Sequence, residues 1–307
     1  MHPRGLFGAL LLAAALSTAT ACSPPPEPPS PSASNGPMTV AVDQFRDGYA
    51  SGTIVLQVTN TSVSGFTLVR AELSDPRFAD GAVWTGSTRF EPGQTTSLPA
   101  VAASPRCAAP STDDTPAAED AAPSVRLRLA DGTERLVRAT DPHAVLGRIH
   151  TQGCFEATVA SLVALRLDDT LEPSAEAETT VLTLRAGPPS APATAGLSTG
   201  GPWGAGAPRR ASVTLTSVEG TTLLAEDPAQ PWPRGVVLAP GSTVKLSVRP
   251  ARCDPHVVAE DKVGTLIPLR LEAGDSSGVV KAEASPALRA ALYGFVGSAC
   301  GWTGQRP

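Results

Sequence analysis

The chain has 307 residues and a formal net charge of −5, from 24 lysines and arginines against 29 aspartates and glutamates. A weakly acidic chain without a basic cluster is a poor match for nucleic acid, so we expect no nucleic-acid partner. The length is enough for two domains of ordinary size.

Residues 1–21 are predicted to be a secretory signal peptide. Arg4 supplies the positive start, and Leu6 to Leu16 form an apolar stretch that is too short to span a bilayer. Ala19-Thr-Ala directly precedes Cys22, which leaves two kinds of processing open. Ala-x-Ala suits ordinary signal peptidase, whereas small residues before a cysteine are typical of a bacterial lipobox, although Ala19 replaces the usual leucine.

The cysteine count favours lipid attachment at Cys22. The chain has five cysteines, and four of them belong to a repeat described below. An odd free thiol is unfavourable in an oxidising compartment, and a lipid would cap it. Residues 22–37 are rich in proline and serine, which predicts an extended tether. We therefore expect a protein anchored to the outer face of the cell membrane through Cys22, the membrane being its first partner.

Two segments of the chain repeat each other. In each, a tryptophan is followed eight residues later by Pro-Gly and then by two cysteines that are 47 positions apart. The matching residues are Trp84, Pro92-Gly93, Cys107 and Cys154 in one segment, and Trp232, Pro240-Gly241, Cys253 and Cys300 in the other. Rare residues in the same order at similar spacing indicate two copies of one domain, each closed by its own disulfide.

Short β-branched segments with alternating polar and apolar residues predict strands through both copies. Asp131-Gly132 predicts a hairpin turn, and Ala273-Gly-Asp275 occupies the same place in the second copy. The fold class expected is mainly β, with two tandem antiparallel immunoglobulin-like β-sandwich domains. The first domain would span residues 38–157 and the second residues 158–307, with the boundary near Phe155 to Ala160.

Each copy is expected to contain one short helix before its last cysteine. Asp141-Pro142 and Ser285-Pro286 each supply an N-cap residue followed by proline at the first helical position. A disulfide would then join the helix to the strand that ends near Cys107 or Cys253. On the loop-entropy argument each such link stabilises the fold by about 4 kcal/mol.

Several short motifs contain residue types that are used in catalysis or metal binding. Ser242-Thr-Val-Lys245 matches a β-lactamase tetrapeptide, but it begins a predicted strand and its partner motifs are missing. His143 and His150 could share a helix face, yet no third metal ligand is evident. Asp254 with Glu260-Asp261 lacks the alternation of a calcium loop. We therefore predict no catalytic residues, metal or cofactor.

As a whole, the chain resembles secreted lipoproteins of actinobacteria. The resemblance covers the lipobox-like signal, the Cys22 region and the tandem layout, and it brings no catalytic residues with it. The leading hypothesis is a cell-surface binding or structural module of the envelope that is not an enzyme. The alternatives are an extracellular hydrolase or enzyme accessory subunit, and a solute-binding transport component.

Overall fold

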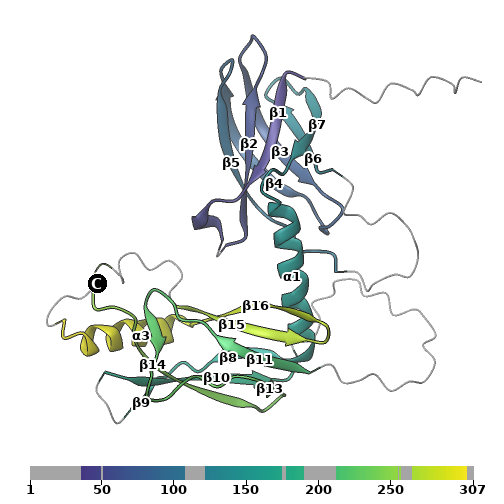
Figure 1. Cartoon of the computed structure of the whole chain (residues 1–307). Helices are drawn as coiled ribbons and strands as arrows, with labels where there is room; N and C mark the ends of the chain where they lie inside the picture. Colours follow the sequence, from purple (N-terminus) through teal and green to yellow (C-terminus); the bar gives the residue numbers. More distant parts are fainter. Residues whose placement is uncertain are drawn as a thin grey trace, which may run out of the picture. The chain divides into compact units, whose positions relative to one another are not determined.

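The computed structural model describes residues 36–49, 51–107, 122–174, 178–189, 212–254, 256 and 265–302. The predicted signal peptide and Cys22 lie outside these ranges. The described part is mainly β and forms several sheets (Figure 1). None of its helices is long and apolar enough to span a bilayer.

The first group of strands, called the first copy, forms one continuous hydrogen-bonded path in the order β4-β3-β6-β7-β1-β2-β5. β7 joins the two halves of this path because it pairs antiparallel with β6 and parallel with β1. A short 3-10 helix, η1 (Arg46–Gly48), follows β1. The strands are β1 (Met38–Asp43), β2 (Thr53–Asn60), β3 (Phe66–Ser74), β4 (Ala82–Phe90), β5 (Thr95–Val101), β6 (Ser124–Leu129) and β7 (Glu134–Thr140).

The second group, called the second copy, forms two sheets. One has the order β12-β14-β10-β8, with β9 paired to β10, and the other has the order β13-β11-β15-β16. The strands are β8 (Ala164–Leu167), β9 (Glu172–Pro173), β10 (Thr180–Gly187), β11 (Val213–Val218), β12 (Leu224–Glu226), β13 (Val236–Leu238), β14 (Thr243–Pro250), β15 (Leu266–Ala273) and β16 (Ser276–Glu283).

The two copies have the same strand order. β4-β3-β6-β7 corresponds to β13-β11-β15-β16, and β1-β2-β5 corresponds to β8-β10-β14. The second copy adds β9 and β12, while the parallel ladder between β7 and β1 belongs to the first. A shared order over seven strands is the structural counterpart of the repeated tryptophan, Pro-Gly and cysteine pattern.

The Pro-Gly turns before β5 and β14 are built alike. Gly93 and Gly241 both have positive φ, +76° and +96°, which glycine adopts without steric cost. The N–H of Gly93 donates to the carbonyl of Asn60 at 2.8 Å, and that of Gly241 donates to the carbonyl of Ala186 at 2.7 Å. Both acceptors lie near the end of the strand paired with the one that follows the turn. The Pro-Gly match therefore reflects one turn used twice.

A β-bulge also recurs in corresponding strands. The register of β3 shifts between Leu68 and Arg70, and that of β11 shifts between Leu215 and Ser217. In each strand the residues on both sides of the bulge point into the core, so two consecutive residues face outward. A bulge at the same place in both copies is a feature that the sequence pattern did not reveal.

Helix α1 (Val145–Leu162) differs from the short helix expected before Cys154. It has 18 residues, so Cys154 lies inside the helix rather than after it. The carboxylate of Asp141 accepts hydrogen bonds from the N–H groups of Val145 and Leu146, at 2.7 and 2.9 Å, and thereby caps the helix from four residues upstream. The helix continues because residues up to Val159 bury apolar side chains.

Helix α3 (Pro286–Ala299) matches the expectation for the second copy. Its N-cap residue Ser285 accepts a hydrogen bond from the Leu288 N–H at 3.1 Å, and Pro286 begins the helix. Cys300 follows the last turn as the C-cap residue.

Each copy has its own buried apolar cluster, and α1 contributes to both. Val145 and Leu146 pack in the first cluster, whereas Phe155, Val159 and Val163 pack in the second. The expected domain boundary between Phe155 and Ala160 therefore falls inside a helix. Residues from Phe155 onward pack with the second copy.

Candidate functional site

The four cysteines of the repeat form the two predicted pairs. Cys107 is bonded to Cys154 and Cys253 to Cys300, and in both pairs the Cα atoms are 5.3 Å apart. Disulfides persist in oxidising compartments, so both bonds indicate a protein outside the cytoplasm. Among the described residues, no three His, Cys, Asp or Glu side chains gather as metal ligands.

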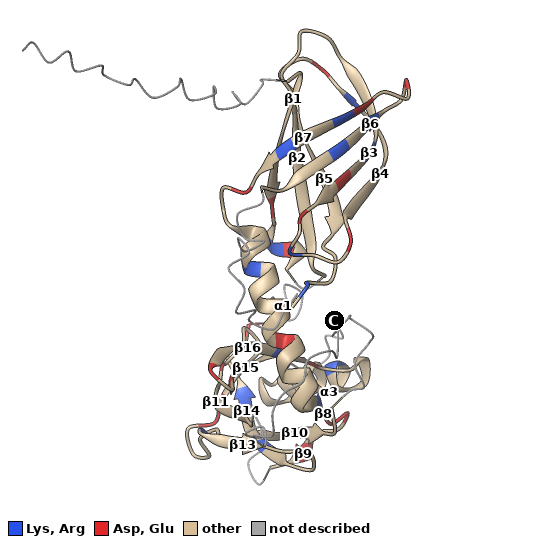
Figure 2. Ribbon diagram, turned by 90° about the vertical axis from the view of Figure 1, so that its right-hand side faces the viewer, with Lys and Arg blue, Asp and Glu red and all other residues tan. Residues whose placement is uncertain are grey.

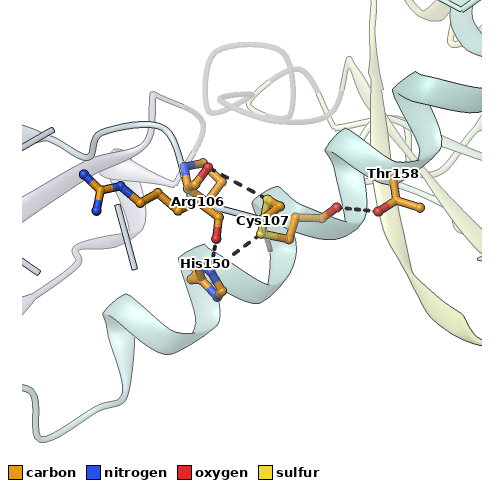
Figure 3. The surroundings of a disulfide bond; sticks show 6 residues. Arg106, Cys107, His150 and Thr158 are labelled. Atoms are coloured by element: carbon orange, nitrogen blue, oxygen red, sulfur yellow. Dashed lines mark hydrogen bonds between the residues drawn. A yellow bond between two sulfur atoms is a disulfide. The ribbon is translucent and has the colours of Figure 1, made fainter. Parts of the chain in front are cut away.

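His150 lies beside the Cys107–Cys154 disulfide (Figure 3). Its Nε2 atom is 3.0 Å from the carbonyl oxygen of Arg106 and 3.6 Å from Sγ of Cys154. The rings of His150 and Phe78 form a T-shaped contact, with their centroids 6.2 Å apart and their planes at 80°. The half-buried His150 thus contacts the disulfide and the segment that carries Cys107. The sequence alone had suggested only that His150 could share a helix face with His143.

The other predicted polar candidates do not converge. His143 is exposed and precedes α1, so it does not share a helix face with His150. Asp254 accepts a hydrogen bond from the backbone N–H of the exposed His256 at 3.0 Å. Glu260 and Asp261 lie outside the described residues.

The Ser-x-x-Lys tetrapeptide lies at the start of β14. Ser242 accepts a hydrogen bond from the N–H of Ala239 at 3.0 Å, which makes it part of the Pro-Gly turn. Lys245 Nζ lies 2.7 Å from Glu172 Oε2. This hydrogen bond, with a weaker one from Thr183, holds the pKa of Glu172 below its usual value. Ser242 and Lys245 therefore have structural partners.

The repeated tryptophans both pack against their own cores. Trp232 is buried, and its Nε1–H donates to the carbonyl of Ser247 in β14 at 2.7 Å. Trp84 in β4 is half-buried against the first core, where its indole ring covers Gly86. Packing against the core accounts for the position of both tryptophans.

One outward surface of the first copy gathers arginines. We call it the arginine face. The strand registers place it on β3, β6 and β7, and Figure 2 colours lysine and arginine positions along the ribbon blue. The strand registers place Arg70 opposite Arg128, and Arg128 in turn opposite Glu134. The charged residues of the face are Arg70, Arg126, Arg128, Arg138, Glu72 and Glu134.

The charges of the arginine face are only partly compensated. Arg70 pairs with Glu72 at 3.0 Å, and Arg126 approaches Glu134 at 3.6 Å. Arg128 and Arg138 are exposed and have no ion-pair partner among the described residues. The face therefore carries positive charge on a chain whose net charge is negative. The sequence shows no continuous basic run, because these arginines alternate with other residues and come from three strands.

The β3 bulge shapes one end of this face. Because Leu68 and Ala71 both point into the core, Val69 and Arg70 both face outward. They line an open hollow together with Thr85, Arg128 and the loop that ends at Gly132. Near the middle of the face, Leu136 lies opposite Arg126 with 69% of its surface exposed. Arginine is among the residues that are enriched in protein-binding surfaces.

The corresponding surface of the second copy is not basic. Its bulge presents Thr216 and Ser217 in place of Val69 and Arg70. Arg270 in β15, the strand that corresponds to β6, forms an ion pair with Glu219. On these corresponding surfaces, the first copy thus has two arginines without an ion-pair partner among the described residues, whereas Arg270 in the second copy is neutralised by Glu219.

No protein family and no curated protein matches this chain. Solved structures align over much of its length but with very low similarity. A protein of unknown function from Porphyromonas gingivalis W83 is 16% identical with a TM-score of 0.20, covering 81% of this chain and 100% of that one. The CupB2 chaperone of Pseudomonas aeruginosa is 14% identical with a TM-score of 0.17, covering 76% and 91%. At such scores neither alignment supports an argument about fold or function.

Proposed function

We propose that this chain is a lipid-anchored envelope protein built from two tandem immunoglobulin-like domains, and that the first domain binds an acidic protein partner through its arginine face. The observation that carries the proposal is the pair of exposed arginines, Arg128 and Arg138, without ion-pair partners among the described residues. On the corresponding strands of the second copy, β11, β15 and β16, the described residues form no such surface.

The strand order supports the domain assignment. In immunoglobulin-like sandwiches one sheet contains the first, second and fifth strands, and the other contains the third, sixth and seventh. The first copy follows this arrangement with β1-β2-β5 and β3-β6-β7, and the second follows it with β8-β10-β14 and β11-β15-β16. The fourth strand of each copy extends the second of these sheets.

The two disulfides and the tether sequence support the location. Disulfides require an oxidising compartment, and residues 22–37 would hold the folded part away from a lipid on Cys22. A Cys22→Ala variant should leave the membrane and enter the soluble extracellular fraction. A variant that sediments with membranes as firmly as the wild type would contradict lipid attachment.

The arginine face supports an acidic partner because guanidinium groups bind carboxylates through paired hydrogen bonds. Leu136 and Val69 add apolar contact area, which favours a protein segment over a simple polyanion. Uncompensated exposed charges also attract an oppositely charged partner over distance, and salt screens this attraction.

The test compares two single substitutions by cross-linking and pull-down from intact cells. Arg128→Ser removes one uncompensated charge from the arginine face. Arg166→Ser removes one exposed charge from β8 and is the matched control. We expect the partner to be recovered with the wild type and Arg166→Ser, to be lost with Arg128→Ser, and to dissociate as salt rises. Equal recovery with all three proteins would overturn the proposal.

A further inference from the structure

The two disulfides have the same Cα–Cα distance but differ in their surroundings. Both close loops with a sequence separation of 47 residues, and both join an exposed cysteine to a half-buried one on or beside a helix. Four residues before Cys154 the helix carries His150, whereas four residues before Cys300 it carries the fully buried Val296. The chain therefore contains its own control for the effect of the histidine.

The contacts of His150 fix where its hydrogen lies. The carbonyl oxygen of Arg106 only accepts hydrogen bonds, so the Nε2 atom 3.0 Å away must be the donor. The same Nε2–H group is 3.6 Å from Sγ of Cys154. A hydrogen-bond donor thus already lies next to the sulfur that would become a thiolate if the disulfide opened.

We propose that Cys107–Cys154 is a thiol-exchange site for small thiols, in which Cys107 is attacked and Cys154 is the leaving group. Cys107 is exposed, so an incoming thiolate reaches its sulfur from solvent. Cys154 is half-buried in α1 and lies next to the His150 donor. Exchange is faster when the leaving thiolate is stabilised, so the donor directs the bond to open toward Cys154.

The small thiol is the only other reactant: two molecules of it are oxidised while the Cys107–Cys154 disulfide is reduced. The thiolate of the small thiol attacks Sγ of Cys107 and forms a mixed disulfide there. The Cys107–Cys154 bond breaks, and its electron pair remains on the sulfur of Cys154, which then shares the Nε2–H of His150 with the carbonyl of Arg106. A second thiolate then attacks the small-thiol sulfur of the mixed disulfide, which releases the Cys107 thiolate and the oxidised small thiol.

The second copy lacks this assistance. Cys300 packs against the apolar core of that copy, where a thiolate is poorly solvated. No described side chain forms a hydrogen bond with the sulfur of either Cys253 or Cys300. The charged groups on the segments beside this part of α1 come from the first copy. They are Arg106 and the Asp75–Arg77 pair, whose segments pack against α1, together with Arg148 of α1 itself.

The first experiment measures both reduction rates in one sample. The full chain is treated with reduced glutathione, quenched with an alkylating reagent and mapped by mass spectrometry. We expect Cys107–Cys154 to be reduced roughly tenfold faster than Cys253–Cys300, as a hydrogen bond to a developing thiolate allows. In His150→Val this advantage should disappear, and in His150→Gln, which keeps a donor, part of it should remain.

The Cys253–Cys300 rate serves as the internal control for folding. If His150→Val merely loosened the first copy, its disulfide would be reduced faster, which is the opposite of the expected change. Equal rates for the two wild-type disulfides, or an unchanged Cys107–Cys154 rate in His150→Val, would overturn the proposal.

The second experiment identifies the attacked sulfur. After brief exposure to glutathione, the mixed disulfide should be found on Cys107 and the alkyl group on Cys154. Glutathione found mainly on Cys154, or equally on both cysteines, would contradict the assigned roles.

Discussion

Gly278 and Phe155 provide a sharp test of how α1 joins the second copy. Gly278 lies in β16 opposite the buried Leu271, so its Cα faces the core. A Cβ atom at Gly278 would lie 2.6 Å from Cδ1 of Phe155 and 2.9 Å from two further ring atoms. Phe155 is only 7% exposed and is packed within the second core. Gly278→Ala should therefore destabilise the protein by about 1–3 kcal/mol, the usual cost of overpacking a core.

A double-mutant cycle measured by chemical denaturation isolates this contact. Phe155→Leu alone should cost part of the roughly 3–5 kcal/mol that complete truncation of a buried phenylalanine costs. In the double variant the new methyl group occupies space left by the ring. The loss of stability should therefore be about 1–2 kcal/mol smaller than the sum of the losses in the two single variants.

Gly294 in α3 is the matched control because a Cβ atom there meets nothing within 4 Å. Gly294→Ala should stabilise the helix by about 0.5–1 kcal/mol. If Gly278→Ala were also stabilising, or if its cost simply added to that of Phe155→Leu, the packing of α1 into the second core would be wrong.

Two further predictions concern the second copy. Trp232→Phe removes the indole donor from the carbonyl of Ser247 and should lower the free energy of unfolding by about 1–3 kcal/mol, measured by chemical denaturation; an unchanged stability would contradict the buried hydrogen bond. The hydrogen bond from Arg185 holds the pKa of Asp168 in the folded protein below its usual value. The ionised Asp168 therefore stabilises the fold fully above its pKa in the unfolded chain, and this stabilisation is lost as the pH falls through its pKa in the folded protein. Asp168→Asn should therefore be less stable than the wild type at pH 7 and equal to it in strong acid, and a constant difference across a pH series of melts would refute this assignment.

The duplication could be predicted from the sequence because tryptophan, Pro-Gly and cysteine are rare, and because the turn and the disulfides each require those residues at fixed places. Pro-Gly before a strand matched a turn with the same hydrogen bonds in both copies, and the cysteine spacing matched both disulfides. The alternation of polar and apolar residues also matches strands such as β6, Ser124–Leu129.

Other elements could not be predicted because local signals were weak. β4 is rich in threonine, serine and glycine and shows little alternation, and β5 contains Pro99, which an edge strand tolerates. The length of α1 was missed because the residues that extend it, such as Phe155, are stabilised by the distant second core. Local sequence does not report such contacts.

The arginine face was only half visible in the sequence. The alternation in β6 places Arg126 and Arg128 on one side of the strand, and this could have been inferred. The contribution of Arg70 depends on the bulge in β3 and on the pairing of β3 with β6, which only the structure gives. The role proposed for His150 likewise depends on a contact across 44 residues.

Disulfide mapping of the purified full chain tests the duplication most directly. Proteolysis without reduction, followed by mass spectrometry, should recover one peptide pair that joins Cys107 to Cys154 and another that joins Cys253 to Cys300. Any linkage between a cysteine of the first copy and one of the second would contradict two independently closed domains.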